Sequence, residues 1–262
     1  MLSNQKEILV SILTPTYNSE KFVSLAIASV QAQSYSNWEL IIVDDASTDG
    51  TLALVTKHAQ VDPRIQVHAL TQNSGTGIAR SKALAVAKGQ YIAFLDADDL
   101  WQPTKLLKQV AFMQTHQLPF TFSYYDCIDE QGRPLNKRVT SPRVVSYRAL
   151  FFCNYIGNLT ALYDAEYFGK IPISSVRKRQ DWMLWLHILQ KIKTAHPVPE
   201  SLAYYRIRNH SVSTSKFNLL QYNFAVYRQF HGLNFVASLL CMQLFLFVQL
   251  AIKPFYTHKI KA

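Results

Sequence analysis

The chain has 262 residues, 49% of them hydrophobic and 17% charged, which excludes a largely disordered protein and predicts one compact domain with a terminal extension. Residues 1–132 hold 9 basic and 13 acidic side chains, whereas residues 133–262 hold 18 basic and 4 acidic ones, giving a formal net charge of +10. This asymmetry fits an acidic, metal-holding half beside a basic half that meets phosphate or an anionic surface, and because no nucleic-acid-binding motif accompanies the basic residues, we expect no nucleic-acid partner.

The amino terminus and the cysteines indicate the compartment. Residues 1–13 run directly into a strand-like stretch and lack the basic region, long apolar segment and cleavage site of a signal peptide. The cysteines are too few and too widely spaced for a disulfide framework or a zinc site: Cys127, Cys153 and Cys241. We therefore expect a cytoplasmic protein.

Short apolar runs alternate with helix-like segments through the first half of the chain. The predicted strands are residues 8–13, 38–43, 64–70 and 91–95, and the predicted helices lie near 20–33, from 51 onward and at 77–87. This βαβαβαβ order is typical of an α/β fold with a mostly parallel sheet flanked by helices on both faces. Because polar clusters follow all four strands, we expect four loops to meet beyond the carboxyl ends of the strands, where such sheets bind ligands.

Two of these clusters fit a nucleotide site. Asp44 and Asp45 follow the second strand, where a carboxylate can accept a hydrogen bond from a ribose hydroxyl or a base; a turn with a helix cap is the equally supported alternative. Arg80 follows the third strand and either reaches a phosphate or is an exposed surface arginine. The sequence has no GxxxxGK[ST] phosphate loop, which argues against the common nucleoside triphosphatases.

Three carboxylates follow the fourth strand, at Asp96, Asp98 and Asp99. Alternate residues at a strand end point the same way, so Asp96 and Asp98 can reach one point while Asp99 turns to a neighbouring one. Mg²⁺ or Mn²⁺ fits such a point, because these ions take one or two protein carboxylates and complete their shell with water and phosphate oxygens. The alternative is that the acids cap the helix beginning near Gln102, but a cap needs only one acid.

The regular alternation ends after about residue 115. A pair of strands is predicted around the turn at Gln131 and Gly132. Further on, residues 180–192 place tryptophans and leucines at helical spacing, so one face of this predicted helix packs inward. Asp181 stands at its start, where an aspartate can simply cap the helix.

Five stretches then occur in a characteristic order, at residues 10–51, 73–84, 89–106, 179–189 and 205–213. Together they resemble bacterial glycosyltransferase family 2, whose members are nucleotide-sugar enzymes of the GT-A fold. The resemblance covers about residues 8–215. It implies a Rossmann-like GT-A domain with a nucleotide-sugar-binding half at 1–115 and an acceptor-binding half at 116–215, followed by a helical extension at 216–262.

The resemblance also implies roles on the donor side of such a site. Pro15, Tyr17 and Asp45 would line the nucleoside pocket, and Arg80 would neighbour the diphosphate. The acids after the fourth strand would form the DxD-type centre that holds Mn²⁺ or Mg²⁺, with the first of them also facing the donor: Asp96, Asp98 and Asp99.

Asp181 matches the catalytic base of the family. Gln180 precedes it where the family usually has glutamate, which leaves the base in place but removes the carboxylate of a second acid. Arg206, or alternatively Arg208 or His210, would lie on a mobile loop that closes over the donor diphosphate.

The resemblance thus implies a metal-dependent, inverting glycosyltransferase of the hexosyl or N-acetylhexosaminyl class. It would move a sugar from a nucleotide-diphosphate sugar, with UDP-sugars favoured, to a glycan or polyprenyl-linked acceptor in surface polysaccharide biosynthesis. The QxxRW signature of processive synthases is absent, so one sugar is added per encounter. Two alternatives are a catalytically altered GT-A binding partner and a sugar-nucleotide nucleotidyltransferase, although the glycine- and lysine-bearing amino-terminal loop of the latter is missing.

Residues 233–252 form an apolar stretch long enough to span a bilayer. Polar residues interrupt it, and Asn234, Ser238 and Gln249 fall on one helical face. We therefore expect a helix that lies in the interface at the inner face of the cell membrane, in preference to a span. Packing of this helix on the domain, or a homodimer through it, are the alternatives.

Overall fold

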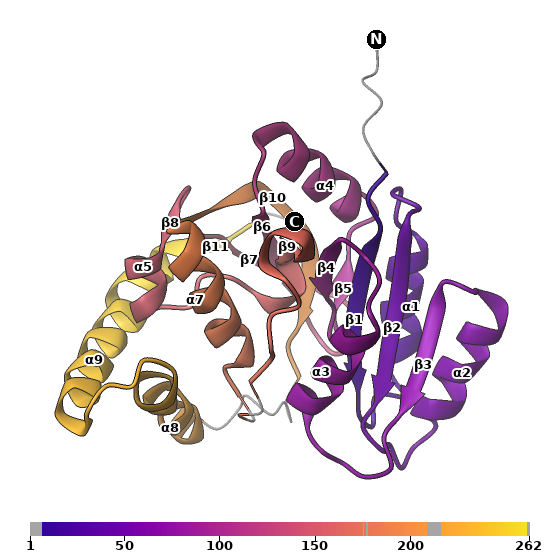
Figure 1. Ribbon diagram of the computed structural model, residues 1–262, viewed down its shortest axis with the longest axis horizontal. Coiled ribbons are helices and arrows are strands. Elements are labelled where there is room, and N and C mark those ends of the chain that lie inside the picture. The colour runs from indigo at the N-terminus through magenta and orange to yellow at the C-terminus, as the bar shows by residue number, and fades with distance from the viewer. Residues whose placement is uncertain (1–6, 175, 177, 209–215, 261–262) are drawn as a thin grey trace.

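The computed structural model describes residues 7–174, 176, 178–208 and 216–260 (Figure 1). In the first half, the expected βαβαβαβ series is confirmed, with boundaries that differ by a few residues from the predicted ones. Its elements are β1 (Val10–Thr16), α1 (Val23–Gln31), β2 (Trp38–Asp44), α2 (Thr51–Val61), β3 (Ile65–Ala69), α3 (Thr76–Val86) and β4 (Tyr91–Phe94).

The second half is less regular, and several of its strands are short. The predicted hairpin forms from two antiparallel strands on either side of Gly132, whose φ of +83° favours glycine, and the predicted 180–192 helix is present. The elements are β5 (Leu100–Trp101), α4 (Lys105–His116), β6 (Phe120–Ile128), β7 (Pro134–Val139), β8 (Val145–Ser146), α5 (Tyr147–Phe152), a 3₁₀ turn (Asn158–Thr160), β9 (Leu162–Asp164), α6 (Ala165–Phe168), α7 (Gln180–Ile192) and β10 (Thr194–Arg206).

The strands join into one sheet in the order β11-β7-β6-β9-β4-β1-β2-β3, and β10 pairs with β6, β5 and β8. Neighbours are parallel throughout β4-β1-β2-β3, whereas β9 pairs antiparallel with β4 and β6, and β7 pairs antiparallel with β6. The first half is therefore parallel throughout, whereas the second half combines antiparallel neighbours with one long parallel pair, β10 with β6. The short connection between β6 and β7 suits an antiparallel pair. The proposed regions 1–115, 116–215 and 216–262 all contribute strands to this sheet.

Helices cover both faces of the sheet. Successive strand residues point to opposite sides, and every residue of β1 and β2 is buried, so both faces need a covering layer. Ile12 belongs to a core that includes residues of α1, α2 and α4, whereas Leu13 belongs to a second core with residues of α3, α5, α7 and α9. Trp182 and Trp185 of α7 are fully buried in the second core. Burying a large apolar side chain of this kind stabilises a fold by about 2–3 kcal/mol, so the start of α7 is fixed firmly beside the sheet.

The carboxyl-terminal extension contains helices and one strand. Its elements are α8 (Lys216–Ala225), a π-helical turn (Val226–Phe230), α9 (Phe235–Phe247), a π-helical turn (Val248–Ile252), a 3₁₀ turn (Lys253–Tyr256) and β11 (Thr257–Lys259). Because β11 pairs antiparallel with β7, the expected helical extension also adds a strand to the sheet. The helical run Phe235–Tyr256 is long and apolar enough to cross a membrane, by length and composition only.

Helix α9 lies at the opposite end of the molecule from α2 (Figure 1). The helical run Phe235–Tyr256, which begins with α9, exposes apolar side chains. Ser238 is fully buried and donates a hydrogen bond of 2.8 Å to the carbonyl of Asn234, and Gln249 Oε1 lies 3.6 Å from Cys153 Sγ. Two members of the predicted polar face therefore lie against the protein. The exposed side chains are Phe235, Val236, Leu239, Leu240, Leu244, Leu246, Phe247, Leu250, Ile252 and Phe255.

Candidate active site

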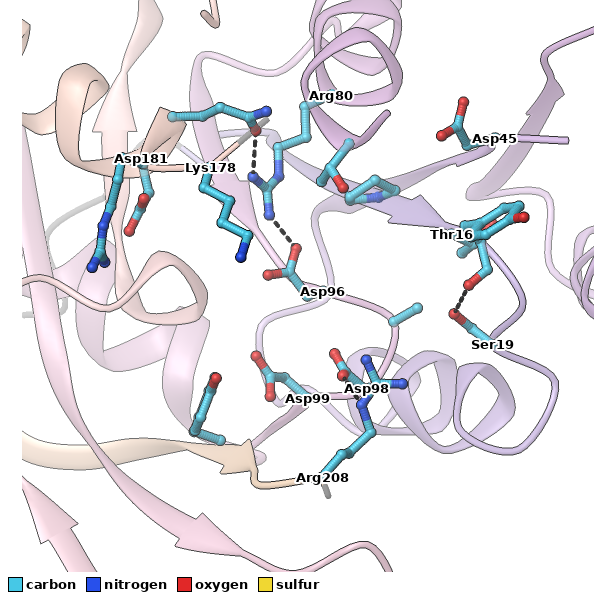
Figure 2. Close-up of a pocket in the computed structure, with 17 residues that line it drawn as sticks. Thr16, Ser19, Asp45, Arg80, Asp96, Asp98, Asp99, Lys178, Asp181 and Arg208 are labelled. Atoms are coloured by element: carbon cyan, nitrogen blue, oxygen red, sulfur yellow. Dashed lines mark hydrogen bonds and ion pairs between the residues drawn. The ribbon is translucent and has the colours of Figure 1, made fainter. Parts of the chain in front are cut away.

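A cavity of about 320 Å³, the first cavity, opens at the carboxyl ends of β1, β2 and β4, where the sequence predicted that loops would meet. In Figure 2, Asp181 and Lys178 lie on one side of Asp96, and Asp45 lies on the opposite side. His210 falls outside the described residues, and Arg206 does not line this cavity. All other predicted site residues do: Pro15, Tyr17, Asp45, Arg80, Asp96, Asp98, Asp99 and Asp181.

The three acids after β4 have different partners. Asp96 forms an ion pair with Arg80, and Asp98 Oδ2 lies 2.9 Å from Arg208 Nε. Asp99 is only 2% exposed, and its carboxylate accepts a hydrogen bond of 2.9 Å from the backbone N–H of Arg206. The turn that holds them is closed by the Asp99 N–H, which donates to the Asp96 carbonyl at 3.0 Å.

Negative charge is concentrated in this turn. Burial raises the pKa of Asp98, and the neighbouring Asp96 raises it further, while Arg208 lowers it. Burial, followed by the charges of Asp98 and Asp96, raises the pKa of Asp99 well above its usual range. Carboxylates this close together repel one another, and a bound divalent cation removes that repulsion.

The donor set fits a hard cation that is shared with a ligand. In the part of the chain that the structure describes, no three Asp, Glu, His or Cys side chains form a group that could hold a metal ion by themselves. Mg²⁺ and Mn²⁺ do not need such a group, because one or two carboxylates and the oxygens of a diphosphate complete their shell. Asp96 and Asp98 both face the first cavity and are the carboxylates that fit this use.

Gln180, at the start of α7, is linked to the acids through Arg80. Arg80 Nη1 donates to Gln180 Oε1 at 3.0 Å, while Nη2 pairs with Asp96. A Cβ added at Gly77 would lie 2.6 Å from Gln180 Nε2, so glycine is needed for the close approach of α3 to this side chain. A carboxylate in place of this amide would face the guanidinium of Arg80.

Asp181 lies in the first turn of α7, one residue inside the helix, whose N-cap position is occupied by Arg179. Its Oδ2 accepts a hydrogen bond of 2.9 Å from Nδ2 of Asn154, which fixes the orientation of the carboxylate. The expected alternative of a helix cap at Asp181 therefore differs from the structure, in which Arg179 holds that position.

In the loop after β2, one acid faces the cavity and another stabilises the turn before α2, so both the ligand-binding and the turn interpretations apply. Asp45 faces the first cavity, but its two oxygens already accept hydrogen bonds from the N–H groups of Ser74 and Gly75, at 2.7 and 2.8 Å. A carboxylate oxygen has two acceptor sites, so a ligand hydroxyl can still bind. Asp49 serves the turn, because its Oδ1 accepts the N–H of Thr51, the first residue of α2, at 3.0 Å.

Arg206 differs from the expectation of a loop residue that closes over a ligand. It is the last residue of β10 and is 2% exposed. Its Nε donates to the carbonyl of Asp98 at 2.7 Å, and Nη1 donates to the carbonyls of Asp129 and Glu130 at 3.1 and 3.0 Å. It thereby ties the β6–β7 turn to the turn at residues 96–99, here called the acid turn. Of Arg206 and Arg208, only Arg208 lines the first cavity.

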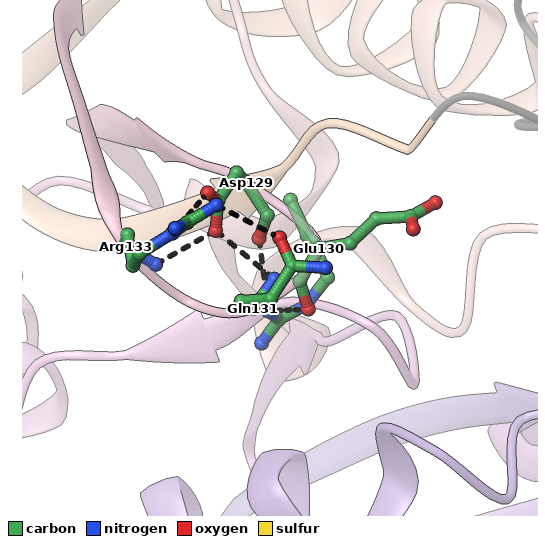
Figure 3. Close-up of polar contacts among 5 residues, drawn as sticks. Asp129, Glu130, Gln131 and Arg133 are labelled. Carbon is green, nitrogen blue, oxygen red and sulfur yellow. Dashed lines mark hydrogen bonds and ion pairs between the residues drawn. The ribbon is translucent and has the colours of Figure 1, made fainter.

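The β6–β7 turn that Arg206 holds has a polar network of its own (Figure 3). The Asp129 carboxylate accepts hydrogen bonds from the N–H groups of Gln131 and Arg133, both at 2.9 Å, and from Arg133 Nε at 2.7 Å. The turn is therefore held by hydrogen bonds of its own in addition to those from Arg206.

A second cavity of about 310 Å³ adjoins the first. The two share six lining residues, namely Arg80, Asp96, Asp99, Arg179, Asp181 and Tyr205. Only the second is lined by Asn154, Tyr155, Lys253 and Tyr256. Sequence reasoning missed Asn154 and Lys253, which carry no local motif, and it missed Arg179, although this basic residue stands two positions before Asp181.

A buried lysine supports the acid turn from behind. Lys105 is fully buried, its Nζ lies 4.0 Å from the ring centroid of Trp101 and donates to Gln109 Oε1 at 2.5 Å. Burial lowers the pKa of Lys105 to about 7. Trp101 in turn donates from Nε1 to the carbonyl of Leu159, a residue of the second cavity, at 2.8 Å. The same indole therefore connects the acid turn with the wall of the second cavity.

Comparison with known proteins agrees with this geometry. Residues 11–163 match the family described as "Glycosyl transferase family 2". The "Putative teichuronic acid biosynthesis glycosyltransferase TuaG" of Bacillus subtilis (strain 168) is 40% identical over 233 residues, which is 89% of this chain and 92% of that protein. An Escherichia coli protein, "UDP-Glc:alpha-D-GlcNAc-diphosphoundecaprenol beta-1,3-glucosyltransferase WfgD", is 34% identical over 216 residues, 82% of this chain and 83% of that protein.

Solved structures show the same fold at low sequence identity. S. aureus TarS 1–349 in complex with UDP-GlcNAc matches with a TM-score of 0.71 and 21% identity, over 93% of this chain and 73% of that chain. The mannosyltransferase PcManGT from Pyrobaculum calidifontis, in complex with GDP-Man and Mn²⁺, matches with a TM-score of 0.65 and 19% identity, over 94% of this chain and 71% of that chain.

Proposed function

The chain belongs to glycosyl transferase family 2, and from this premise we propose that it moves one sugar from a nucleotide-diphosphate sugar to a glycan or lipid-linked acceptor, with inversion at the anomeric carbon. The observation that carries this proposal is the position of Asp181 between two adjoining cavities, both of which its side chain lines. A single carboxylate that faces a donor site and an acceptor site is what a one-step displacement requires.

We assign the first cavity to the donor. Asp45 and Tyr17 would contact the nucleoside, and Arg80 and Arg208 would neutralise the diphosphate, because guanidinium groups bind phosphate oxygens in a bidentate manner. Asp96 and Asp98 would hold Mn²⁺ or Mg²⁺, which when bound supplies positive charge to the leaving diphosphate. The names of TarS in complex with UDP-GlcNAc and of the UDP-Glc-dependent WfgD support a UDP-sugar as donor.

We assign the second cavity to the acceptor. Asp181 would take the proton from the acceptor hydroxyl as that oxygen attacks the anomeric carbon, and Asn154 would keep the carboxylate in position. The bond to the nucleoside diphosphate breaks as the new glycosidic bond forms, so no covalent enzyme intermediate is needed. The names of TuaG and WfgD support a role in the synthesis of a surface polysaccharide.

The test is an assay of donor turnover with a panel of UDP-sugars and glycan or lipid-linked acceptors, in which the product is identified by mass spectrometry and its anomeric configuration by NMR. We expect release of the nucleoside diphosphate together with an inverted glycoside. Release of pyrophosphate would instead indicate a nucleotidyltransferase. Nucleotide binding without any product, across the panel, would indicate a binding partner that has lost its chemistry.

The exposed apolar side of α9 supports a further part of the proposal, namely contact with the inner surface of the cell membrane. The most apolar 18-residue window of the helical run Phe235–Tyr256 has a mean hydropathy of 2.2, and 17% of that window is buried. Since Ser238, Met242 and Phe245 on the other side are packed into the domain, the run fits a helix that lies on a membrane better than one that spans it. Contact with a membrane would bring the active site to lipid-linked acceptors.

Flotation with anionic liposomes tests this contact. Truncation near residue 230 is a poor variant, because it also removes Phe245 from the core and β11 from the sheet. The paired substitution Leu240→Glu and Leu244→Glu acts on side chains that are 57% and 51% exposed, and we expect it to abolish flotation. Leu107→Glu, on the 46% exposed side chain of α4, is the matched control and should float like the wild type. Loss of a dimer in place of loss of flotation would favour a homodimer through α9.

A further inference from the structure

The carboxyl-terminal segment completes the wall of the second cavity. Lys253 and Tyr256 line it, although they follow the end of the family match by about ninety residues. The ring of Tyr256 packs at 5.5 Å and 82° against that of Tyr155, and its carbonyl accepts a hydrogen bond of 2.8 Å from Thr140 N–H. The segment is therefore a fixed part of this cavity.

Two basic side chains meet in this wall, close to Asp181. Lys253 and Arg179 both line the second cavity. Arg179 is held in place by its Nε, which donates to Oδ1 of the buried Asn223 at 2.6 Å, and this bond leaves the outer guanidinium nitrogens for a ligand. For Lys253 Nζ, no hydrogen bond or ion pair occurs with any residue that the structure describes.

Among the residues that the structure describes, no carboxylate forms an ion pair with Lys253, although Asp181 lines the same cavity. Burial lowers the pKa of Lys253, and the positive charges of Arg179 and Lys137 lower it further, while Cys153 and Asp181 oppose this effect. An ammonium group in such a place is stabilised by an anionic ligand. The donor diphosphate does not supply that anion in our assignment, because Lys253 does not line the first cavity.

We propose that Lys253, together with Arg179, binds a phosphate group carried by the acceptor. The inference rests on the proposed function, since it assumes that the second cavity receives the acceptor. The ligand chemistry is a phosphate or diphosphate ester next to the sugar whose hydroxyl reaches Asp181. Its source is either a lipid-linked sugar diphosphate or a soluble sugar phosphate.

The apolar surroundings of Lys253 indicate what an experiment should compare. Leu250, Ile252 and Phe255 are exposed on the same helical run, with 75%, 38% and 76% of their surface accessible. A cation within an apolar surface suits a ligand with a charged group next to a hydrocarbon chain. The comparison is therefore between one sugar presented as a prenyl diphosphate ester, as a 1-phosphate and as an uncharged alkyl glycoside.

The variant is Lys253→Gln, with Lys253→Arg as the conservative form and Lys57→Gln, on the exposed side of α2, as the matched control. With the wild type, we expect a lower KM for the phosphorylated acceptors than for the alkyl glycoside. In Lys253→Gln, the KM ratio of phosphorylated to uncharged acceptor should rise about 10- to 100-fold, the usual value of a charge-assisted contact, and Lys253→Arg should restore most of it. An unchanged ratio would overturn the proposal. A preference for the 1-phosphate over the prenyl ester would identify a soluble source and keep the phosphate site.

A binding measurement separates this inference from the proposed function. With the first cavity saturated by UDP and Mn²⁺, calorimetry reports binding of the sugar 1-phosphate whether or not the sugar is transferred. We expect Lys253→Gln to weaken this binding about 10-fold or more relative to Lys57→Gln. Equal binding by both variants would overturn the phosphate site, whereas tight, Lys253-dependent binding without transfer would contradict only the proposed reaction.

Discussion

The two cavities lie side by side but are assembled in different ways. The first is made mainly of loops that directly follow β1, β2 and β4, so its position is a property of parallel strands whose carboxyl ends share one rim. The second is made from β6, the end of β7, residues 154–159 and the turn before β11, which come together only when distant strands pair.

This difference has a physical consequence for what each cavity tolerates. A change in the first cavity acts on a small cluster of carboxylates and arginines that neutralise one another. A change in the second acts on segments that also hold the sheet and the carboxyl-terminal helix together. Substitutions that affect only one cavity, or the residues they share, therefore test whether donor and acceptor functions are separate.

The largest effect is expected at Asp181, which lines both cavities. Asp181→Asn keeps the shape of the side chain but cannot accept a proton, so turnover should fall about 10²- to 10⁴-fold. Donor binding, measured by calorimetry with a nucleoside diphosphate, should stay close to the wild type. The matched control is Asp164→Asn at the N-cap of α6, where Asn caps equally well. Normal turnover in Asp181→Asn would mean that the base lies elsewhere.

A slightly smaller effect is expected at Asp98, which lines only the first cavity. Removing the cation with a chelator should stop turnover, and added Mn²⁺ should restore it. Asp98→Asn should lower turnover about 10²- to 10³-fold, because the charge that holds the cation is lost, while the melting temperature stays within a few degrees. Full activity in excess chelator would contradict a metal-dependent reaction and leave the acids with a role in binding only.

Arg206 and Arg208 should separate stability from donor binding. Arg206→Gln removes a buried guanidinium that bonds three carbonyls, and we expect the free energy of unfolding to fall by about 1–3 kcal/mol, as measured by urea denaturation. Arg208→Gln should raise the donor KM about 10-fold, with little change in stability. If Arg206→Gln instead raised the donor KM and left the stability intact, the arginine expected from the sequence would be the correct one.

Gln180→Glu is expected to have a small effect on the Mn²⁺ requirement, through Arg80 and Asp96, which line both cavities. The new carboxylate would compete with Asp96 for Arg80 and add negative charge to the site, so half-maximal activation should need about 2- to 10-fold less Mn²⁺. Gln190→Glu adds the same charge at the far end of α7 and serves as the control. An unchanged or higher Mn²⁺ requirement would show that Arg80 does not limit the availability of Asp96.

The smallest effect is expected on the pH dependence of stability, through Lys105. This lysine packs on Trp101, which follows the acid turn and binds the Leu159 carbonyl in the wall of the second cavity. Its pKa falls from 10.5 to about 7 on folding, so between these values the unfolded chain binds one more proton than the folded chain. The free energy of unfolding should therefore rise with pH, by about 1 kcal/mol between pH 7.5 and 8.5, and the cost of burial is complete below pH 7. Urea denaturation should show this rise in the wild type and a flatter profile in Lys105→Met. Equal slopes would contradict it.

The sequence could predict the first cavity because its signals are local. The strand before Asp96 and the acids after it are neighbours in the chain, and the rim on which they meet follows from the parallel order of the strands. Arg206 and Arg208 could not be told apart in this way. Which of them faces a ligand depends on where β10 ends and on the contact of Arg206 with the β6–β7 turn.

The second cavity lies beyond local reasoning. Asn154 binds Asp181 across 27 positions, and Lys253 reaches the cavity only because β11 pairs with β7. Which side of α9 faces the protein could not be predicted for a related reason. The Ser238 hydroxyl donates to the Asn234 carbonyl at the start of the same helix, so this polar residue can be buried while the leucines stay exposed. Polarity along a helix does not identify the buried side when polar groups find partners within the protein.

The attachment of α9 at both ends has a consequence for geometry at a bilayer. The helix is fixed at its start by the contact of the Leu233 N–H with the Tyr227 carbonyl, and at its far end by β11. A flexible linker would let the catalytic domain sample many heights above the lipid. Because α9 is fixed to the domain at both ends, it would instead hold the domain at one height and one tilt. On a membrane, Asp181 would therefore lie at a constant distance from the head groups. Only acceptors whose terminal hydroxyl projects that far from the lipid would reach it.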